Sequence, residues 1–323
     1  MELEYSQVAE GIYRVECGLY HPGLVACYLL RSGEHLAFID TGTAHTVPAL
    51  LYLLQILGCR PEQVDYVIPT HVHLDHAGGA GVLMRACPQA KLVVHPKGAP
   101  HLVDPQRLEA GAKAVYGEEA FLRDFGALEP VPVDRVIPAK DGQTLMLGER
   151  ELRIFHTPGH ANHHICIFDE QTAGLFSGDT LGVSYKALAG TRGPWLFAPT
   201  TPVAFDPEAW EQTIDRLMAL EAETLYLTHY GPFSPSPERI RGLRLSIRSF
   251  AEIALIEEKL PVQGRRARLE SAVGAYLLGF AKAQGCTLPE TRIRDWLAVD
   301  IPLNAQGLEV WLARRAKRAG QSA

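Results

Sequence analysis

The sequence predicts an α/β sandwich, in which helices cover the outer faces of two packed sheets, followed by a C-terminal helical region. Short β-rich runs form two blocks on either side of a mostly helical stretch at 98–128. A proline-rich segment at 232–237 follows the second block, and helical patterns fill the rest of the chain. Sheets and helices each bury one apolar face, and stacked layers satisfy both.

The first block contains short apolar runs separated by glycine-containing turns, which favours strands. Between two of these runs, residues 46–57 place apolar side chains at helical spacing. The expected strands are 11–16, 25–30, 36–40, 64–68 and 92–95, and the expected helices are 46–57 and 78–87.

The second block repeats the pattern after Pro138. Asp206 followed by Pro207 is typical of a helix start, because the carboxylate caps free N–H groups and proline suits the first turn. The expected strands are 143–147, 152–155, 164–168, 174–177 and 224–228, and the expected helix is 206–220.

The C-terminal region differs from the rest in pattern and in charge. Helices are expected at 238–260, 266–283, 290–297 and 308–318. Residues 1–233 hold 16 Lys and Arg against 28 Asp and Glu, whereas residues 234–323 hold 15 against 9. This asymmetry indicates a separate C-terminal unit. We interpret its basic character first as a solvated helix face, with docking on the acidic part of the chain or binding of an anionic substrate as alternatives.

Composition favours an ordinary globular protein. The 323 residues are 47% hydrophobic, and no apolar stretch approaches the roughly 20 residues that a bilayer span requires. The N-terminal residues are acidic and polar, and the six cysteines are scattered without a Cys-x-x-Cys pair. We therefore expect a cytoplasmic protein with no membrane segment and with free thiols.

The richest chemical signal is a cluster of ligand-type side chains directly after the expected strand 64–68. His71, His73, Asp75 and His76 place three imidazoles and one carboxylate within six residues. Nitrogen and oxygen donors of this kind suit zinc and related transition metals. Four such groups in one turn are hard to explain by packing, because buried polar groups need partners.

Three more ligand-type residues follow apolar runs further along the chain. His160, Asp179 and His229 each lie in or beside a glycine, where a tight turn can direct a side chain towards a common point. Each alone is more typical of a turn, but their order after the first cluster predicts one metal site.

Taken together, these motifs resemble the metallo-β-lactamase superfamily over about residues 8–232. The resemblance implies an αββα sandwich with a metal site at one edge of the sheets. It implies a catalytic domain at 1–233 and a C-terminal helical domain at 234–323. It assigns His71, His73 and His160 to a first metal, assigns Asp75, His76 and His229 to a second, and places Asp179 between the two. Asp40, in an Asp-Thr-Gly motif, is implied as support for the ligand loop.

This ligand set implies a hydrolase with two divalent metal ions. We expect zinc, with manganese or iron as alternatives. Two adjacent metals lower the pKa of a shared water and supply hydroxide, which would attack an ester, thioester or lactone-type small molecule. We expect Asp75 to accept and later return the proton.

Within the superfamily, the chain is most similar to the glyoxalase II, lactonase and general hydrolase branch. Only 49 residues separate Asp179 from His229, which excludes the inserted domain of the related nucleases. We expect His163 and His164, which follow His160, to support the metal ligands or contact the substrate. We expect the same of Tyr185 and Trp195, which lie in a stretch that we assign to the pocket wall.

Two other activities remain open. Persulfide dioxygenases resemble the chain in the same histidine motif and use one iron, and ligand types alone do not separate iron from zinc. A phosphodiesterase or ribonuclease is ranked third, because the basic tail lacks the aromatic and basic interleaving of single-strand binders, so nucleic acid is not an expected partner. Apolar side chains near 303–312 leave a homodimer open.

Overall fold

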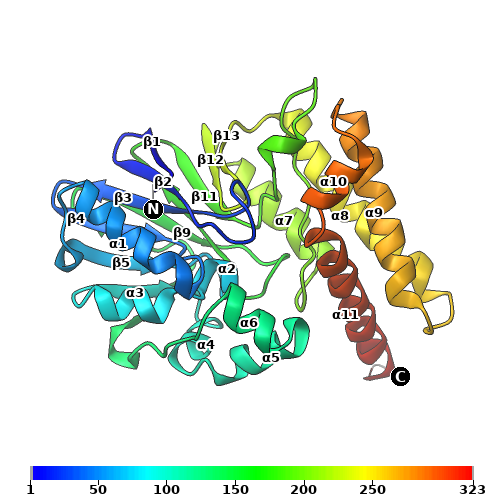
Figure 1. Cartoon of the computed structure of the whole chain (residues 1–323), viewed down its shortest axis with the longest axis horizontal. Helices are drawn as coiled ribbons and strands as arrows, with labels where there is room; N and C mark the ends of the chain where they lie inside the picture. The colour runs from blue at the N-terminus through cyan, green and yellow to red at the C-terminus, as the bar shows by residue number, and fades with distance from the viewer. Residues whose placement is uncertain (1–2, 322–323) are drawn as a thin grey trace. The chain divides into compact units, whose positions relative to one another are not determined.

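The structure contains two mixed sheets, as the sequence predicts (Figure 1). The computed structural model describes residues 3–321. The first sheet has the strand order β1-β2-β3-β4-β5-β6-β7, and the second has the order β13-β12-β11-β10-β9-β8. The strands of the first sheet are β1 (Tyr5–Ala9), β2 (Ile12–Glu16), β3 (Ala26–Ser32), β4 (His35–Ile39), β5 (Val64–Ile68), β6 (Lys91–Val94) and β7 (Val136–Pro138). Those of the second are β8 (Thr144–Leu147), β9 (Arg150–His156), β10 (Ile165–Asp169), β11 (Gly174–Gly178), β12 (Thr224–Leu227) and β13 (Gly231–Phe233).

Helices accompany the sheets and fill the C-terminal region. The first group comprises α1 (Val47–Ile56), α2 (Leu74–Ala77), α3 (Ala80–Ala86), α4 (Ala99–Val103), α5 (Gln106–Tyr116) and α6 (Glu118–Asp124). The later helices are α7 (Pro207–Met218), α8 (Pro237–Glu258), α9 (Arg265–Ala283), α10 (Glu290–Trp296) and α11 (Asp300–Gln321). Single 3₁₀ turns cover Ala44–Thr46, Pro61–Gln63, Val133–Arg135 and Lys186–Leu188.

Two apolar layers hold the sheets in place. Between the sheets, Tyr28 and Ile39 of the first pack with Ile154, Phe176 and Tyr226 of the second. On the other face of the first sheet, alternate strand residues pack on helices, because successive side chains of a strand point to opposite faces. The members of this outer layer include Leu29 and Phe38 from the strands, Leu50 and Leu54 from α1, and Leu83 and Met84 from α3.

Parallel pairing decides which loops share an edge. Strand β4 pairs with β5 in parallel, and β11 pairs with β12 in parallel. The carboxyl ends of parallel neighbours lie at the same edge of a sheet. Asp40 therefore lies beside the loop after β5, and the turn after β11 lies beside the turn after β12.

Helices α8, α9 and α11 pack against one another in the C-terminal region, and α10 contacts α9. Backbone contacts group the chain into two compact units. One contains both sheets and α1–α6, and the other contains α7–α11 with residues 179–206 and the short segment 158–162. A domain boundary between residues 233 and 234 stays a prediction.

Most predicted elements are present, and the differences have physical reasons. Strands β1, β7 and β13 were not expected, because each is short or polar and depends on pairing with a neighbouring strand. The expected helical stretch at 98–128 consists of three helices, α4 to α6, separated at Asp104–Pro105 and at Gly117, whose φ is 83°. Helix α11 begins at Asp300 rather than near residue 308, because Pro302 is tolerated in a first turn.

The composition led to two expectations that the structure addresses, one about the cysteines and one about membrane-spanning helices. All six cysteines are free thiols. Among the described residues, no helix is both long and apolar enough to span a bilayer.

A buried ion pair fixes the end of the second sheet. Arg150 donates from Nε and Nη2 to the two Asp169 carboxylate oxygens at 2.7 and 2.6 Å, and both side chains are at most 1% exposed. The remaining Nη1 donates to the carbonyl of Glu10 at 3.1 Å, so the guanidinium also ties in the turn between β1 and β2. Such a pair is costly to break, because one buried charge is then left without compensation.

We predict that Arg150→Met lowers the free energy of unfolding by about 3–5 kcal/mol, because Asp169 loses its counter-charge. Arg153→Met is the matched control, since Arg153 lies on the same strand but pairs with Glu170 at 38% exposure and should cost less than about 1 kcal/mol. Urea unfolding of both variants measures the difference. Equal losses would contradict a special role for the buried pair.

His95, directly after β6, is a second buried polar group. Burial, together with repulsion by His156 and Lys97, lowers the pKa of His95 to about 4 from its ordinary value of 6.5. The rings of His95 and His156 lie 4.2 Å apart, and Nδ1 of His95 accepts a hydrogen bond from the Lys97 N–H at 3.0 Å. The native protein therefore holds this imidazole neutral.

A neutral His95 makes stability depend on pH. Between pH 6.5 and about 4 the unfolded chain binds the proton more tightly, so the free energy of unfolding should fall as the pH drops through that range, by about 1–3 kcal/mol. His95→Asn keeps an acceptor for Lys97 and should lose this part of the pH dependence. His35→Asn, at a half-exposed histidine, should retain it. Denaturation at several pH values tests the prediction, and identical profiles for His95→Asn and the unchanged protein would refute it.

Candidate metal centre

The histidine-rich loop begins where β5 ends. The strand stops at Ile68, the loop runs through His71, and His73 precedes the short helix α2, which carries Asp75 and His76. A helix of this length places Asp75 and His76 on adjacent positions of one turn. Gly78 ends the helix, and a side chain there would collide with the Leu74 carbonyl at 2.3 Å. The sequence thus forces the ligand-type residues into a tight turn.

One group of ligand-type atoms comprises Asp75, His76 and His229, which lie within 4.8 Å of one another. Oδ2 of Asp75 lies 3.2 Å from Nε2 of His229 and 3.7 Å from Nε2 of His76. His76 is fully buried and His229 is nearly so, whereas the Asp75 side chain is 26% exposed. Three such atoms around one point could hold a metal ion.

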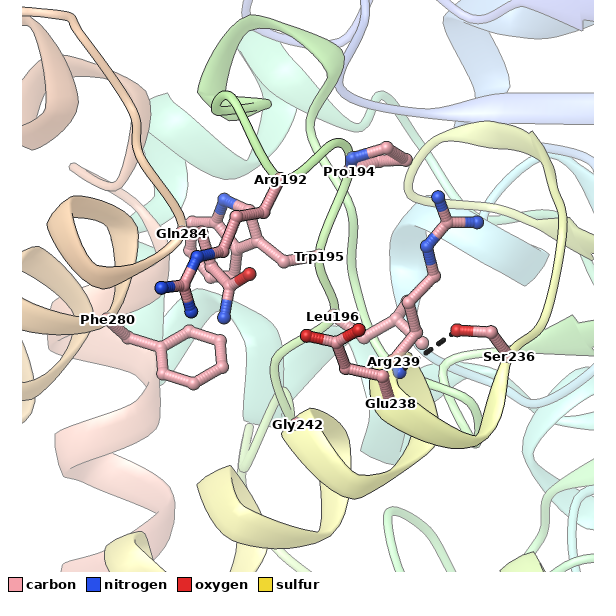
Figure 2. A pocket seen from close by; sticks show the side chains of 10 residues that line it. All are labelled: Arg192, Pro194, Trp195, Leu196, Ser236, Glu238, Arg239, Gly242, Phe280 and Gln284. Atoms are coloured by element: carbon pink, nitrogen blue, oxygen red, sulfur yellow. Dashed lines mark hydrogen bonds between the residues drawn. The ribbon is translucent and has the colours of Figure 1, made fainter.

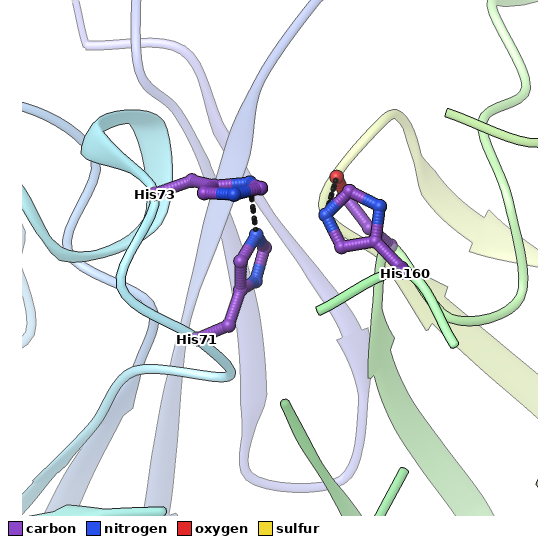
Figure 3. Close-up of side chains that lie close together, drawn as sticks. His71, His73 and His160 are labelled. Atoms are coloured by element: carbon purple, nitrogen blue, oxygen red, sulfur yellow. Dashed lines mark hydrogen bonds and ion pairs between the residues drawn. The ribbon is translucent and has the colours of Figure 1, made fainter. Parts of the chain in front are cut away.

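The other group comprises His71, His73, His160 and Asp179, whose ligand-type atoms also lie within 4.8 Å of one another. Nε2 of His71 lies 2.8 Å from Nδ1 of His73, and Nε2 of His160 lies 3.4 Å from Oδ2 of Asp179. Figure 3 shows the rings of the three histidines directed towards a common space. All seven residues that the sequence predicts as ligands therefore belong to one of the two groups.

Carbonyl oxygens set the tautomer of two of these imidazoles. Nδ1 of His229 donates to the carbonyl of Leu24 at 2.8 Å, and Nδ1 of His160 donates to that of Pro199 at 2.7 Å. A carbonyl can only accept, so the proton is on Nδ1 and the lone pair is on Nε2. In both residues Nε2 is the atom that faces a carboxylate of its group. Neutral imidazoles oriented in this way fit a metal ion.

Asp40 holds the histidine-rich loop in position through hydrogen bonds. Its carboxylate accepts from the backbone N–H of Thr70 at 2.7 Å, the Thr70 hydroxyl at 2.9 Å, Nδ1 of His76 at 2.8 Å and the Thr228 hydroxyl at 2.7 Å. The side chain is 1% exposed, and the residue adopts a left-handed conformation with a φ of 57°. Asp40 thus connects the β5 loop to the residue before His229.

His163 and His164, which are expected beside the metal ligands, lie in different surroundings. His164 is buried, bonds the Thr157 hydroxyl through Nδ1 at 2.8 Å, and stacks on His71 with ring centres 4.8 Å apart. His163 lies 6.2 Å from the His71 ring, and its Nδ1 accepts from the Val72 N–H at 3.5 Å. Both histidines therefore flank the first group, and roles in supporting ligands or binding substrate stay predictions.

Tyr185 and Trp195 pack within the compact unit that contains α7–α11, which we call the helical unit. The Tyr185 hydroxyl donates to Asp300 at 3.1 Å, and the Trp195 indole donates to the carbonyl of Leu188 at 2.8 Å. Neither of these partners is a candidate ligand. A substrate role for these two residues stays a prediction.

Several residues of the site were missed by sequence reasoning. Thr70 and Thr228 carry polar contacts of Asp40, and their position immediately before a candidate histidine was an available signal. Tyr20 and Tyr116 were also missed. Partial burial raises the pKa of both phenols; the negative charges of Asp124 and Asp75 add to the effect for Tyr20, and that of Asp75 adds to it for Tyr116. No sequence pattern places either tyrosine near Asp75.

Known proteins match this sequence and fold. A family model described as the metallo-beta-lactamase superfamily matches residues 21–229. The match covers more than half of the chain, and the chain therefore belongs to the metallo-β-lactamase superfamily. The sandwich expected from the sequence is confirmed.

Individual relatives share 25% to 28% of their aligned residues with this chain. The metallo-beta-lactamase fold-containing protein ST1585 of Sulfurisphaera tokodaii is 25% identical over 230 residues, 70% of this chain and 80% of the relative. Acyl-coenzyme A thioesterase MBLAC2 of Homo sapiens is 28% identical over 197 residues, 55% of this chain and 66% of the relative. Hydroxyacylglutathione hydrolase of Aeromonas hydrophila is 28% identical over 203 residues, 62% of this chain and 59% of the relative. The chain thus spans slightly less than two thirds of the last two relatives.

Solved structures show the same fold. ST1585 from Sulfolobus tokodaii superposes with a TM-score of 0.62 at 21% identity, covering 93% of this chain and 98% of the other. The metallo-beta-lactamase family protein TTHA1429 from Thermus thermophilus gives a TM-score of 0.62 at 22% identity, with 90% and 94% covered. At this identity, the likeness establishes the fold alone.

We predict that Asp40→Asn lowers the affinity for metal about 10–100-fold, because an amide cannot accept from all four donors and His76 loses its orientation. Asp65→Asn, at a partly exposed carboxylate that contacts His35, is the matched control. Metal content after dialysis against graded chelator measures both. Unchanged retention in Asp40→Asn would contradict the positioning role.

Proposed function

We propose that the protein is a metal-dependent hydrolase that acts on thioesters or related esters and lactones and uses two divalent ions. The observation that carries the proposal is the presence of two ligand groups rather than one. His71, His73, His160 and Asp179 would hold the first ion, and Asp75, His76 and His229 would hold the second, with Asp179 shared. Zinc is the expected metal, since the donors are imidazole and carboxylate.

Relatives support a thioester-type substrate within this class. One is named as an acyl-coenzyme A thioesterase, and another as a hydroxyacylglutathione hydrolase. Both names describe cleavage of a bond between an acyl group and sulfur. This agrees with the glyoxalase II and lactonase branch that the sequence predicts. A cytoplasmic location and a homodimer stay predictions.

The candidate ligands and the residues that hold them have separate roles in the proposed hydrolysis. Two divalent ions held by the two ligand groups would supply hydroxide near neutral pH and would stabilise negative charge on the substrate carbonyl oxygen. The Asp75 side chain is partly exposed, and its contacts to His76 and His229 both use Oδ2. We assign proton transfer to the carboxylate of Asp75. Asp40, through His76 and Thr70, keeps the loop in position, and the carbonyl of Pro199 does the same for His160.

The alternative activity is oxidation of a persulfide with a single iron. The same first group suits an iron ion, so the donors do not exclude it. The assembly of Asp75, His76 and His229 within 4.8 Å favours two metals. Measured stoichiometry separates the two activities.

Elemental analysis of protein purified without added metal tests the proposal. About two zinc or manganese ions per chain, with metal-dependent hydrolysis of acyl-coenzyme A or lactoylglutathione thioesters, are expected. About one iron per chain, with oxygen consumption on persulfides and no hydrolysis, would replace the hydrolase proposal by the oxidative one.

We predict that Asp75→Asn reduces kcat for thioester hydrolysis about 10²–10⁴-fold, because the amide cannot accept a proton. Asp134→Asn, at an exposed carboxylate beside β7, should leave kcat unchanged. Metal content is measured on each variant alongside kcat. Unchanged turnover by Asp75→Asn that retains its metal would remove the proton role of Asp75.

A further inference from the structure

A cavity within the helical unit has no part in the metal centre. It is formed by the turn at 190–195, the first turns of α8 and the end of α9, and its volume is about 230 Å³ (Figure 2). None of the residues that line it is a candidate metal ligand. Ligand pockets for drug-sized molecules begin near 300 Å³, and one water occupies about 30 Å³ in the liquid. The cavity therefore suits a small organic molecule.

Close backbone contacts build the walls of this cavity. Thr191 and Arg192 donate backbone N–H bonds to the carbonyls of Gly285 and Gln284 at 3.1 and 3.2 Å, which attaches the turn to the end of α9. Gly190 permits this contact, because a Cβ there would lie 2.2 Å from the Gln284 carbonyl oxygen. These backbone contacts thus fix the turn that forms one side of the cavity.

Aromatic side chains form one wall. Trp195 is 5% exposed, its indole N–H is held by the Leu188 carbonyl, and its ring meets that of Phe280 edge-on at 5.2 Å. Gly242 of α8 leaves space above this wall, since a Cβ there would lie 3.3 Å from the Phe280 ring. A flat apolar group fits against Phe280 and Trp195.

Opposite charges occupy different sides of the same cavity. Figure 2 shows the Glu238 carboxylate directed into the cavity from α8, and the Arg192 guanidinium on the other side, next to Gln284 and Phe280. Arg239 also lines the cavity, and its side chain extends away from Glu238 towards Pro194. No ion pair joins Glu238 to Arg192 among the side chains that the structure describes. A ligand carrying both charges would engage each with a charge-assisted hydrogen bond.

We propose that this cavity binds a small zwitterion of the α-amino-acid type with an aromatic or large apolar side chain. The carboxylate of the ligand bonds Arg192, its ammonium group bonds Glu238, and its side chain packs on Phe280 and Trp195. Gln284 adds an amide that can donate or accept. Both side chains are exposed, so a simple anion or a simple amine leaves no buried charge behind, but each makes one charge-assisted hydrogen bond fewer than the zwitterion and should bind less tightly.

Calorimetric titration with three matched probes tests the proposal. L-phenylalanine, 3-phenylpropionate and 2-phenylethylamine share the phenyl ring and differ in charge. We expect saturable binding of phenylalanine at one molecule per chain, and at least tenfold weaker binding of each truncated probe. Absence of saturable phenylalanine binding overturns the proposal. So does equal affinity for 3-phenylpropionate, which would indicate a plain anion site, or for all three probes.

Substitutions of the lining residues then test whether the probes bind in this cavity. Glu238→Gln should weaken phenylalanine at least tenfold and leave 3-phenylpropionate unchanged, whereas Arg192→Gln should weaken both but spare 2-phenylethylamine. Gly242→Leu should fill the cavity and abolish binding of all probes. Arg241→Gln is the control, because Arg241 is exposed on α8 and does not line the cavity. Circular dichroism confirms that each variant is folded, and phenylalanine binding that survives Gly242→Leu in a folded protein overturns the location.

Discussion

The buried carboxylate of Asp40 is the constraint on which the candidate metal centre depends. A charge at 1% exposure is tolerated only when hydrogen bonds replace water, and four donors do so here. Those donors come from the loop after β5, from α2 and from the end of β12. The same bonds that stabilise the charge therefore fix the orientation of His76 and connect the loop to the residue next to His229.

Sheet topology explains why distant segments meet at this carboxylate. Asp40 and the histidine loop follow parallel strands of the first sheet, whereas Asp179 and His229 follow parallel strands of the second. Each sheet thus presents two of its strand ends at one edge. Short turns containing glycine then place the side chains, and backbone carbonyls at Leu24 and Pro199 set the tautomers of His229 and His160.

The segment between Asp179 and α7 contributes to two features of the helical unit. Near its end, Pro199 holds His160, and in its middle the turn at 190–195 closes the charged cavity. Between these, the Ala198 N–H donates to the Ser246 hydroxyl of α8 at 2.9 Å. The segment is therefore a structured part of the protein, because its backbone is held by α8 and by the end of α9.

The sequence by itself determined the superfamily, the sandwich and the seven ligand candidates, because strand periodicity and the spacing of histidines are local properties of the chain. It did not reveal β1, β7 or β13, whose existence depends on pairing with a neighbouring strand. Nor did it reveal that Thr70 and Thr228 serve Asp40, that Tyr20 and Tyr116 lie near Asp75, or that Glu238 and Arg192 face one cavity. Only the tertiary structure decided these contacts, since each joins residues whose separation in sequence carries no periodic signal.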